Sequence, residues 1–494
     1  MKRISSAIFA LILLLSSFSF AGSLDNVRFA THENKLRVVL DLTGEVKYSL
    51  DEKGNGLVIT LSETEATENI PGVVEINDWA VPHARINREG NDLKVEFPLD
   101  NPIGYNVFSL SGPSRLVIDF GKSFTKVSDS QQVSDGLEYY SVAKRGDSGL
   151  VKVQVLKVDP KKVDIFPSLA EPEAGIWDWM AGFFKGPVKK DKTFTRETVK
   201  DIVRQKGAVA GVNATYFAGN GRPLGVLVVD GEIVSCPIHD RTAMILTDKN
   251  RALIDNISFM GYFKKGEKKF DITKINEPRS SRSEVVLYTR RYGGLTGTDR
   301  SGYELAVEKS KVVDTATGSL LIPEEGYVLS AGQGLAEILP DQIKKDDKIE
   351  TVLHLLPYSL DLKEQENVLH VVGGGPRLLK SGKIYISKYE EKFKKDIAQG
   401  RAARTAAGIT KDGEILFVTV DGLPRNKNQR SESSSIGMTL TELAYFMGSI
   451  GAVDAINFDG GGSSTMILND RVQNVPADGS LRKVSNAILI KPRR

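Results

Sequence analysis

The chain has 494 residues, which is enough for two or three domains with a sizeable core. Its 66 basic and 63 acidic residues give a formal net charge of +3, which does not indicate a nucleic-acid-binding protein. A hydrophobic content of 40% is typical of a soluble globular protein. The single cysteine, Cys236, excludes an internal disulfide, so the fold must depend on its own core.

The N-terminus has the pattern of a secretory signal peptide. Lys2 and Arg3 precede an apolar run from Ala7 to Leu15, and Ser19-Phe20-Ala21 offers small residues for cleavage. A retained membrane anchor is the alternative, but the apolar run is short for a membrane span. We therefore predict a signal peptide at residues 1–21 and export to the periplasm or cell envelope, with no transmembrane span after cleavage.

Residues 24–122 alternate apolar and polar side chains in short runs separated by turn residues. About eight short strands in roughly 100 residues predict an antiparallel β-sandwich. The clearest predicted strands are Val27–Phe29, Lys35–Leu42, Leu57–Leu61, His83–Ile86, Asp92–Phe97, Tyr105–Phe108 and Arg115–Phe120.

Two of these strands carry a resemblance to a known family. The runs Arg37–Leu42 and Pro113–Phe120 resemble the AMIN domain of bacterial envelope proteins. That resemblance implies a sandwich that targets its host protein to the periplasm or cell wall and binds peptidoglycan.

Residues 123–137 are rich in Ser, Asp and Gln and are predicted to be a linker. Beyond them, 138–494 mixes helical and strand patterns, which predicts an α+β domain. A helix is expected over Phe194–Val203 with Thr195 as its N-cap, and another over Gly437–Met447 with Thr439 near its start. Polar residues repeatedly follow buried strands: Asn213 after Ala208–Val212, Gly373-Gly374-Gly375 after Val368–Val372, and Asp421 after Glu414–Val420.

The most informative of these strand ends is Asn457–Met466, which follows the apolar segment Ala452–Ile456. Asp459 stands there before three glycines and the hydroxyls of Ser463 and Ser464. Glycines let a ligand approach main-chain N–H groups closely, and a carboxylate at such a loop can act as an acid, a base or a ligand acceptor. A plain tight turn is the alternative.

Several kinds of catalytic site are excluded by the sequence. The five histidines form no HExxH arrangement and no close pair, which argues against a zinc hydrolase. No Gly-x-Ser-x-Gly elbow supports a serine hydrolase. Carboxylates and arginines remain, and these suit a substrate with both a sugar and a phosphodiester. Each charge taken alone also fits a surface residue or an ion-pair partner. The charged candidates are Asp421, Glu442, Asp459, Arg241 and Arg404.

Six segments resemble, in order, one family over about 138–492: the phosphodiester glycosidases, whose animal member is the uncovering enzyme of the lysosomal mannose-phosphate pathway. The segments are Gly211–Phe217, Gly373–Pro376, Arg404–Gly408, Val420–Gly422, Gly437–Ala444 and Asn457–Ser464. The resemblance implies hydrolysis of a sugar-1-phosphodiester without a nucleotide cofactor.

The chain departs from the family pattern at two places. The family often has Asn-Gly-Gly where this chain has Asn213-Ala214-Thr215, and Asp-Gly-Arg where it has Asp421-Gly422-Leu423. Arg425 is the candidate to replace the missing arginine.

Together these features predict an exported glycosidase of sugar-1-phosphodiesters, acting on a cell-envelope glycan and targeted by its N-terminal domain. The predicted catalytic residue is Asp459, paired with Asp421 or Glu442. A non-catalytic glycan-binding or adhesion protein of the same fold is the alternative, and a bound calcium ion is compatible with either. The predicted substrate-binding residues are Asn213, Arg241, Arg404, Gly374, Gly375, Gly460, Gly461, Gly462, Ser463 and Ser464.

Overall fold

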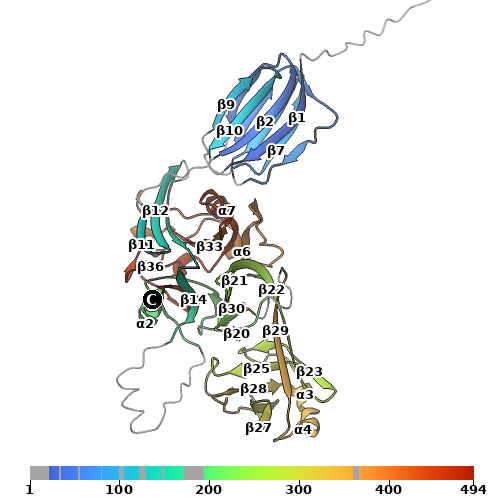
Figure 1. The fold of residues 1–494 in the computed structure, drawn as a ribbon, viewed down its shortest axis with the longest axis vertical. Coiled ribbons are helices and arrows are strands. Elements are labelled where there is room, and N and C mark those ends of the chain that lie inside the picture. The colour runs from blue at the N-terminus through green and yellow to red at the C-terminus, as the bar shows by residue number, and fades with distance from the viewer. Residues whose placement is uncertain are drawn as a thin grey trace, which may run out of the picture. The chain divides into compact units, whose positions relative to one another are not determined.

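The computed structural model describes residues 22–493 apart from 33–34, 54–55, 79, 100–104, 122–129, 147–148, 172–193 and 360–366. The predicted signal peptide at 1–21 therefore lies outside the described residues. The chain divides into two compact units, Met1–Lys122 and Ser123–Arg494. Both are built mainly of β-strands (Figure 1).

The N-terminal unit contains two five-stranded sheets, in the orders β5-β1-β2-β10-β9 and β3-β4-β8-β7-β6. Their strands are β1 (Gly22–Thr31), β2 (Lys35–Gly44), β3 (Tyr48–Lys53), β4 (Gly56–Leu61), β5 (Thr64–Ala66), β6 (Val73–Glu75), β7 (His83–Glu89), β8 (Asp92–Pro98), β9 (Tyr105–Leu110) and β10 (Arg115–Gly121).

The two sheets meet through side chains that alternate along their strands. Leu36, Val38 and Leu40 of β2 are fully buried, with more exposed residues between them. Phe97 of β8 packs on Phe120 of β10 with ring centroids 5.3 Å apart, so one core joins both sheets. One pairing, β1 with β5, is parallel rather than antiparallel as predicted. The similarity to AMIN domains remains a prediction.

The C-terminal unit is organised around three larger sheets with the orders β11-β12-β13-β34-β33-β35-β31-β32, β14-β39-β16-β36-β37 and β20-β19-β30-β21-β22-β23, where β29 pairs with β22. The strands of the first are β11 (Gln131–Ser134), β12 (Leu137–Gly146), β13 (Gly149–Val158), β31 (Arg377–Lys380), β32 (Lys383–Ile384), β33 (Arg404–Thr410), β34 (Ile415–Val420) and β35 (Ala452–Asn457). Those of the second are β14 (Val163–Leu169), β16 (Ala210–Asn213), β36 (Met466–Leu468), β37 (Arg471–Val472) and β39 (Asn486–Pro492). Those of the third are β19 (Leu227–Val229), β20 (Glu232–Ser235), β21 (Thr242–Thr247), β22 (Ala252–Lys265), β23 (Lys268–Ile272), β29 (Glu350–Pro357) and β30 (Val368–Gly373).

A fourth sheet, with the order β24-β25-β28-β26-β27, is inserted between β23 and β29. Figure 1 shows the paired strands β22 and β29 leading towards it. Its strands are β24 (Lys274–Ile275), β25 (Val285–Thr289), β26 (Tyr303–Glu308), β27 (Lys311–Thr317) and β28 (Gly326–Ala331).

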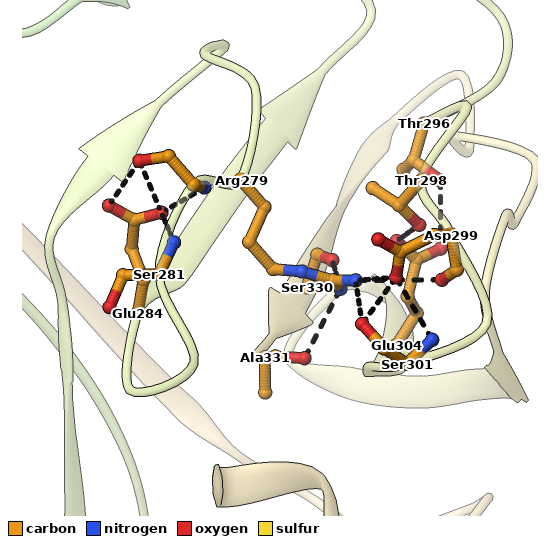
Figure 2. A network of polar contacts seen from close by, with 11 residues as sticks. Arg279, Ser281, Glu284, Thr296, Thr298, Asp299, Ser301, Glu304, Ser330 and Ala331 are labelled. Atoms are coloured by element: carbon orange, nitrogen blue, oxygen red, sulfur yellow. Dashed lines mark hydrogen bonds and ion pairs between the residues drawn. The ribbon is translucent and has the colours of Figure 1, made fainter. Parts of the chain in front are cut away.

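Buried charges hold the loops of this inserted sheet (Figure 2). The Glu304 side chain is fully buried and accepts hydrogen bonds from the hydroxyls of Thr296 and Thr298 and from the Leu320 N–H. Arg279 donates to the Ser330 hydroxyl at 2.8 Å and to the Asp299 carboxylate at 2.7 Å. Because each buried charge has polar partners, the network stabilises one conformation of the loops.

The helices in the described part of this unit are short. They are α2 (Val199–Gln205), α3 (Gln333–Ala336), α4 (Leu339–Gln342), α6 (Lys395–Ala398) and α7 (Leu440–Ser449), with 3-10 turns η1 (Lys427–Gln429) and η2 (Gly461–Ser463). Two-residue ladders pair β15 (Glu197–Thr198) with β38 (Lys483–Val484), and β17 (Tyr216–Phe217) with β18 (Pro223–Leu224). Strands predominate, so the predicted α+β class is not confirmed. In the part of the chain that the structure describes, no helix is long and apolar enough to cross a membrane.

The two predicted helices differ in how well their starts were placed. Thr439 is the N-cap of α7, as expected. In α2 the N-cap is Thr198 rather than Thr195, because Glu197 and Thr198 first pair with β38 from the far end of the chain. The strand β11 falls within the segment predicted as a linker.

Candidate functional site

The loop after β35 begins with Asp459, whose main chain is held on both sides. The Asp459 N–H donates to the carbonyl of Ala214 at 3.1 Å, and its own carbonyl accepts from Asn213 Nδ2 at 2.6 Å. Asn213 Oδ1 in turn accepts from Thr405 Oγ1 at 2.8 Å and from the Thr465 N–H at 3.0 Å. Asn213 therefore joins the ends of β16, β33 and β35.

The Asp459 carboxyl is partly buried, and burial raises its pKa to about 6. The Ser463 hydroxyl, the charge of Arg482 and the Gly460 N–H act in the opposite direction, because each favours the ionised form. Arg482 donates to Ser463 Oγ at 3.2 Å and forms an ion pair with Asp478 at 2.6 Å. The carboxyl consequently titrates near neutral pH, which suits an acid–base group.

The three glycines of this loop serve different purposes. A Cβ on Gly460 would lie 2.8 Å from the Ala403 carbonyl, and one on Gly462 would overlap the Arg482–Asp478 pair. Gly461 has a positive φ of 63° with open space where a Cβ would lie. The Gly461 N–H donates to the Ala403 carbonyl at 2.8 Å, so this N–H is occupied by the chain itself.

Tyr216 of β17 contacts two of the segments that carry predicted site residues. Its hydroxyl donates to the Gly375 carbonyl at 2.9 Å and accepts from Asn457 Nδ2 at 2.9 Å. Burial raises the pKa of Tyr216 most, and the Asp459 charge raises it further.

Arg404 and Arg241 lower the pKa of the same Tyr216 hydroxyl. Three side chains that the sequence predicted to share a site, Asp459, Arg404 and Arg241, therefore lie within electrostatic reach of one tyrosine.

Both arginines are fixed by main-chain carbonyls. Arg404 is 4% exposed and donates to Met438, Ile397 and Gly400 at 3.0–3.1 Å. Burial lowers its pKa, because desolvation disfavours the cation. Arg241 donates to the carbonyls of Glu391 and Lys392.

Arg241 also stacks on an aromatic ring beside Tyr216. Its guanidinium carbon lies 3.9 Å from the ring centroid of Phe393, and the Phe393 and Tyr216 rings are 5.8 Å apart. The two residues before it, His239 and Asp240, both have positive φ angles, of 54° and 47°. Non-glycine residues adopt this conformation at a cost, so the fold holds Arg241 in place against local strain.

Glu391 fastens the segment that carries Phe393. Its buried carboxylate accepts from the N–H and hydroxyl of Thr242 at 3.1 and 2.6 Å, from the Arg377 N–H at 3.2 Å and from the Ser387 hydroxyl. Gly375 lies against this carboxylate, where a Cβ would overlap Glu391 Oε2.

Gly374, the other predicted glycine after β30, faces the strand end that leads to Asp459. A Cβ there would lie 2.7 Å from the Asn457 carbonyl. Both glycines therefore permit β30 to approach the neighbouring chain closely.

The second predicted carboxylate has two candidates in different settings. Glu442 belongs to the capping box of α7: one oxygen accepts from the Thr439 N–H at 2.8 Å, and the other pairs with Arg401. Asp421 is 2% exposed, and its Oδ1 accepts from the Val475 N–H at 3.0 Å. Burial raises the pKa of Asp421 to about 6, against smaller opposing effects of Val475 and Lys152.

Ser464 completes the glycine loop and is 1% exposed. Its N–H donates to the Gly461 carbonyl at 3.3 Å and its carbonyl accepts from Asn474 Nδ2 at 2.9 Å. Arg425, the candidate for the missing family arginine, pairs with Asp478 at 2.9 Å and so joins the charges around Arg482.

No cluster of three or more His, Cys, Asp or Glu side chains that could hold a metal ion occurs within the described residues. The calcium hypothesis therefore gains no support from the arrangement of acidic side chains.

The sequence did not identify Tyr216, Glu391, Phe393 or Arg482 as site residues. Tyr216 was accessible in principle, because it lies three residues beyond Asn213 in a recognised segment. Glu391 and Arg482 lie in irregular segments, where no strand end or periodicity marks them.

Comparisons with known proteins bear on this arrangement. Residues 301–491 match the model of a family described as phosphodiester glycosidase. The match is shorter than the region of 138–492 in which the sequence segments resemble that family. It contains Gly374, Gly375, Arg404, Asp421, Glu442 and the Asp459 loop, whereas Asn213, Tyr216 and Arg241 precede it.

The chain is 26% identical over 208 residues to the N-acetylglucosamine-1-phosphodiester alpha-N-acetylglucosaminidase of Bos taurus. That alignment covers 40% of this chain and 36% of the bovine protein, so it spans little more than a third of that relative.

Two solved structures resemble the fold over most of the chain. A hypothetical protein from Synechocystis has a TM-score of 0.59 at 20% identity, covering 96% of this chain and 81% of that one. A protein from Burkholderia pseudomallei has a TM-score of 0.55 at 19% identity, covering 90% and 97%. At these identities the likeness shows the fold alone.

Proposed function

We propose that this chain is an exported hydrolase that cleaves the glycosidic bond of a sugar-1-phosphodiester in a cell-envelope glycan. The observation that carries the proposal is the grouping of Asp459, with its pKa of about 6, and two arginines around Tyr216. The match of residues 301–491 to the phosphodiester glycosidase family supports the same chemistry.

In this reaction a water oxygen becomes bonded to the anomeric carbon, and the bond between that carbon and the phosphate oxygen breaks. The phosphate leaves as a monoester and gains negative charge, which Arg241 and Arg404 stabilise. Asp459 either accepts a proton from the attacking water or donates one to the leaving phosphate oxygen, or it bonds to the anomeric carbon as a nucleophile and is then displaced by water. A carboxyl with a pKa of about 6 is available in both protonation states near neutral pH.

Asp421 is the better candidate for the second carboxylate. Both oxygens of Glu442 already have partners in the α7 cap and the Arg401 ion pair. Asp421 has a raised pKa of its own, with burial as its main cause. Environments that raise the pKa of a carboxyl are typical of catalytic acids and bases.

Export and targeting form the remainder of the proposal. The N-terminal pattern of Lys2, Arg3 and the apolar run supports secretion. The resemblance of Arg37–Leu42 and Pro113–Phe120 to AMIN domains supports a wall-directed role for the N-terminal unit, with peptidoglycan as its ligand.

One observation favours the alternative of a glycan-binding protein without turnover. All three Arg404 nitrogens donate to main-chain carbonyls, as a structural arginine would. In that case the site retains the fold of a glycosidase and binds sugar without cleaving it.

The test is a time course of the mature full-length chain on UDP-N-acetylglucosamine and on a p-nitrophenyl sugar-1-phosphodiester. Asp459→Asn is the test variant, and Asp412→Asn, an exposed carboxylate on a turn, is the matched control. We expect free sugar from the wild type and the control but none from Asp459→Asn, with cooperative unfolding retained in all three.

Each other outcome has a defined meaning. Release of sugar phosphate instead of free sugar would contradict cleavage at the anomeric carbon. No release by any form, together with retention on envelope polymers, would favour the binding protein. Loss of cooperative unfolding in Asp459→Asn would make that residue structural.

A further inference from the structure

The segment of residues 380–395 is strongly basic and contacts the candidate site through Arg241. It contains six lysines and two glutamates, a formal charge of +4, against +3 for the whole chain. Glu391 is buried within the fold. Five of the six lysines are exposed, so most of the positive charge faces solvent: Lys380, Lys383, Lys392, Lys394 and Lys395.

The same segment exposes two tyrosines, each with a lysine over its ring. Tyr389 is 76% exposed, and Lys388 Nζ lies 5.1 Å from its ring centroid. Tyr385 is 41% exposed, with Lys380 Nζ 5.6 Å from its ring centroid. An aromatic face offers packing area to a sugar ring, and the adjacent ammonium groups attract phosphate.

The segment is fixed to the candidate site rather than attached loosely. The buried Glu391 carboxylate binds Thr242 and Arg377. Arg241 stacks on Phe393 and donates to the Lys392 carbonyl. Tyr389 is therefore two residues from Glu391, whose carboxylate binds Thr242 next to Arg241.

We propose that residues 380–395 form a docking surface for the part of a phosphate-bearing glycan polymer that extends beyond the sugar in the site. The proposal rests on the proposed function for the identity of that polymer. Lysines would neutralise successive phosphates, while Tyr385 and Tyr389 would pack against the sugars between them. The preferred substrate class is then a poly(sugar phosphate) rather than a small nucleotide sugar.

The experiment measures equilibrium binding of three soluble probes to the full-length chain, carrying Asp459→Asn to prevent turnover, by isothermal titration calorimetry. The probes are poly(N-acetylglucosamine 1-phosphate), sodium polyphosphate, and a neutral N-acetylglucosamine hexamer. They present sugar with phosphate, phosphate alone and sugar alone.

Two variants separate the contributions of charge and ring. The triple variant Lys388→Ala, Lys392→Ala and Lys394→Ala should lower the affinity for the sugar-phosphate polymer at least tenfold. It should also make that affinity less dependent on salt concentration. Tyr389→Ala should lower the affinity for that polymer severalfold and leave the affinity for polyphosphate unchanged. The matched control is Lys269→Ala with Tyr262→Ala, a similar stack of 4.2 Å on the β22–β23 hairpin, and it should change neither affinity.

The proposal is overturned if the polymer binds no tighter than polyphosphate, or if the control variant weakens binding as much as the test variants. Equal binding to vesicles containing phosphatidylglycerol would identify a membrane surface instead. Failure of the proposed function would give a different result. If the wild type releases no sugar but the polymer still binds, residues 380–395 are a docking surface on a non-catalytic protein.

Discussion

Asn213 Nδ2 lies 2.6 Å from the carbonyl oxygen of Asp459, across a separation of 246 residues in the chain. The other end of the same amide accepts from Thr405 and Thr465. Asn213 thus fixes the main chain of Asp459 and has little hydrogen-bonding capacity left for a ligand. Its contribution to a site would be made through the position of that carboxyl.

Asn213→Ala should lower the free energy of unfolding by about 2–4 kcal/mol, because it leaves the Asp459 carbonyl, the Thr405 hydroxyl and the Thr465 N–H without their partner. Urea unfolding followed by fluorescence measures the change. Asn220→Ala, at an exposed turn, should cost much less. Equal losses of unfolding free energy in both variants would contradict the inference that Asn213 fixes the main chain of Asp459.

Ser463→Ala should raise the pKa of Asp459 further above 6, because the lost hydroxyl hydrogen bond favours the ionised carboxyl. Arg482→Gln should act in the same direction through the lost charge. We expect a rise of about 0.5–1 unit, measured by carbon-13 NMR of the Asp459 carboxyl. The exposed Ser433→Ala should not move it, and a fall in either test variant would contradict the assignment of these neighbours.

The stability of the C-terminal unit should depend on the ionisation of Asp421. Its folded pKa of about 6 lies above the ordinary value of 3.8, so the protonated form is favoured in the folded state. Its contribution to stability is fully present below pH 3.8 and is lost as pH rises through 6.

Asp421→Asn keeps an acceptor for the Val475 N–H but carries no charge. Its free energy of unfolding should therefore rise relative to the wild type between pH 4 and 7.5, by on the order of 3 kcal/mol. Paired urea titrations at several pH values measure this difference. The exposed Asp412→Asn should give a flat difference, and a flat difference for Asp421→Asn as well would show that burial does not control its titration.

Glu304→Ala should destabilise the inserted sheet, because the Thr296 and Thr298 hydroxyls donate to that carboxylate (Figure 2). The Leu320 N–H also donates to it. A loss of about 3 kcal/mol or more is expected for a buried charged network that loses its centre. Hydrogen exchange should locate the loss in β25–β28. Glu308→Ala, exposed on the same strand, is the control.

The sequence predicted strands well where apolar and polar side chains alternate regularly. The expected strands at Lys35–Leu42 and Arg115–Phe120 lie within β2 and β10, because one face of each strand is buried. The sequence also named Asp459, Arg404 and Arg241 as members of one site. The charges of these three side chains all act on the pKa of Tyr216, while their roles in a site stay a prediction.

Long-range pairing was not accessible from the sequence. The inserted sheet of β24–β28 was not foreseen, and the start of α2 shifted because β38 pairs with Glu197 and Thr198. Glu391 contributes through three hydrogen bonds to Thr242 and Arg377 on other segments, so only the folded chain reveals its position.

The pairing of β39 with both β14 and β16 affects how the C-terminal unit folds. The side chain of Asn486 exchanges hydrogen bonds with Thr215 across 271 residues of sequence. The sheet that contains β14 and β16 therefore cannot close until β39 has joined it. Contacts this distant slow folding. Until β39 pairs with them, β14 and β16 have unpaired edges, and unpaired edges make partly folded chains prone to aggregate.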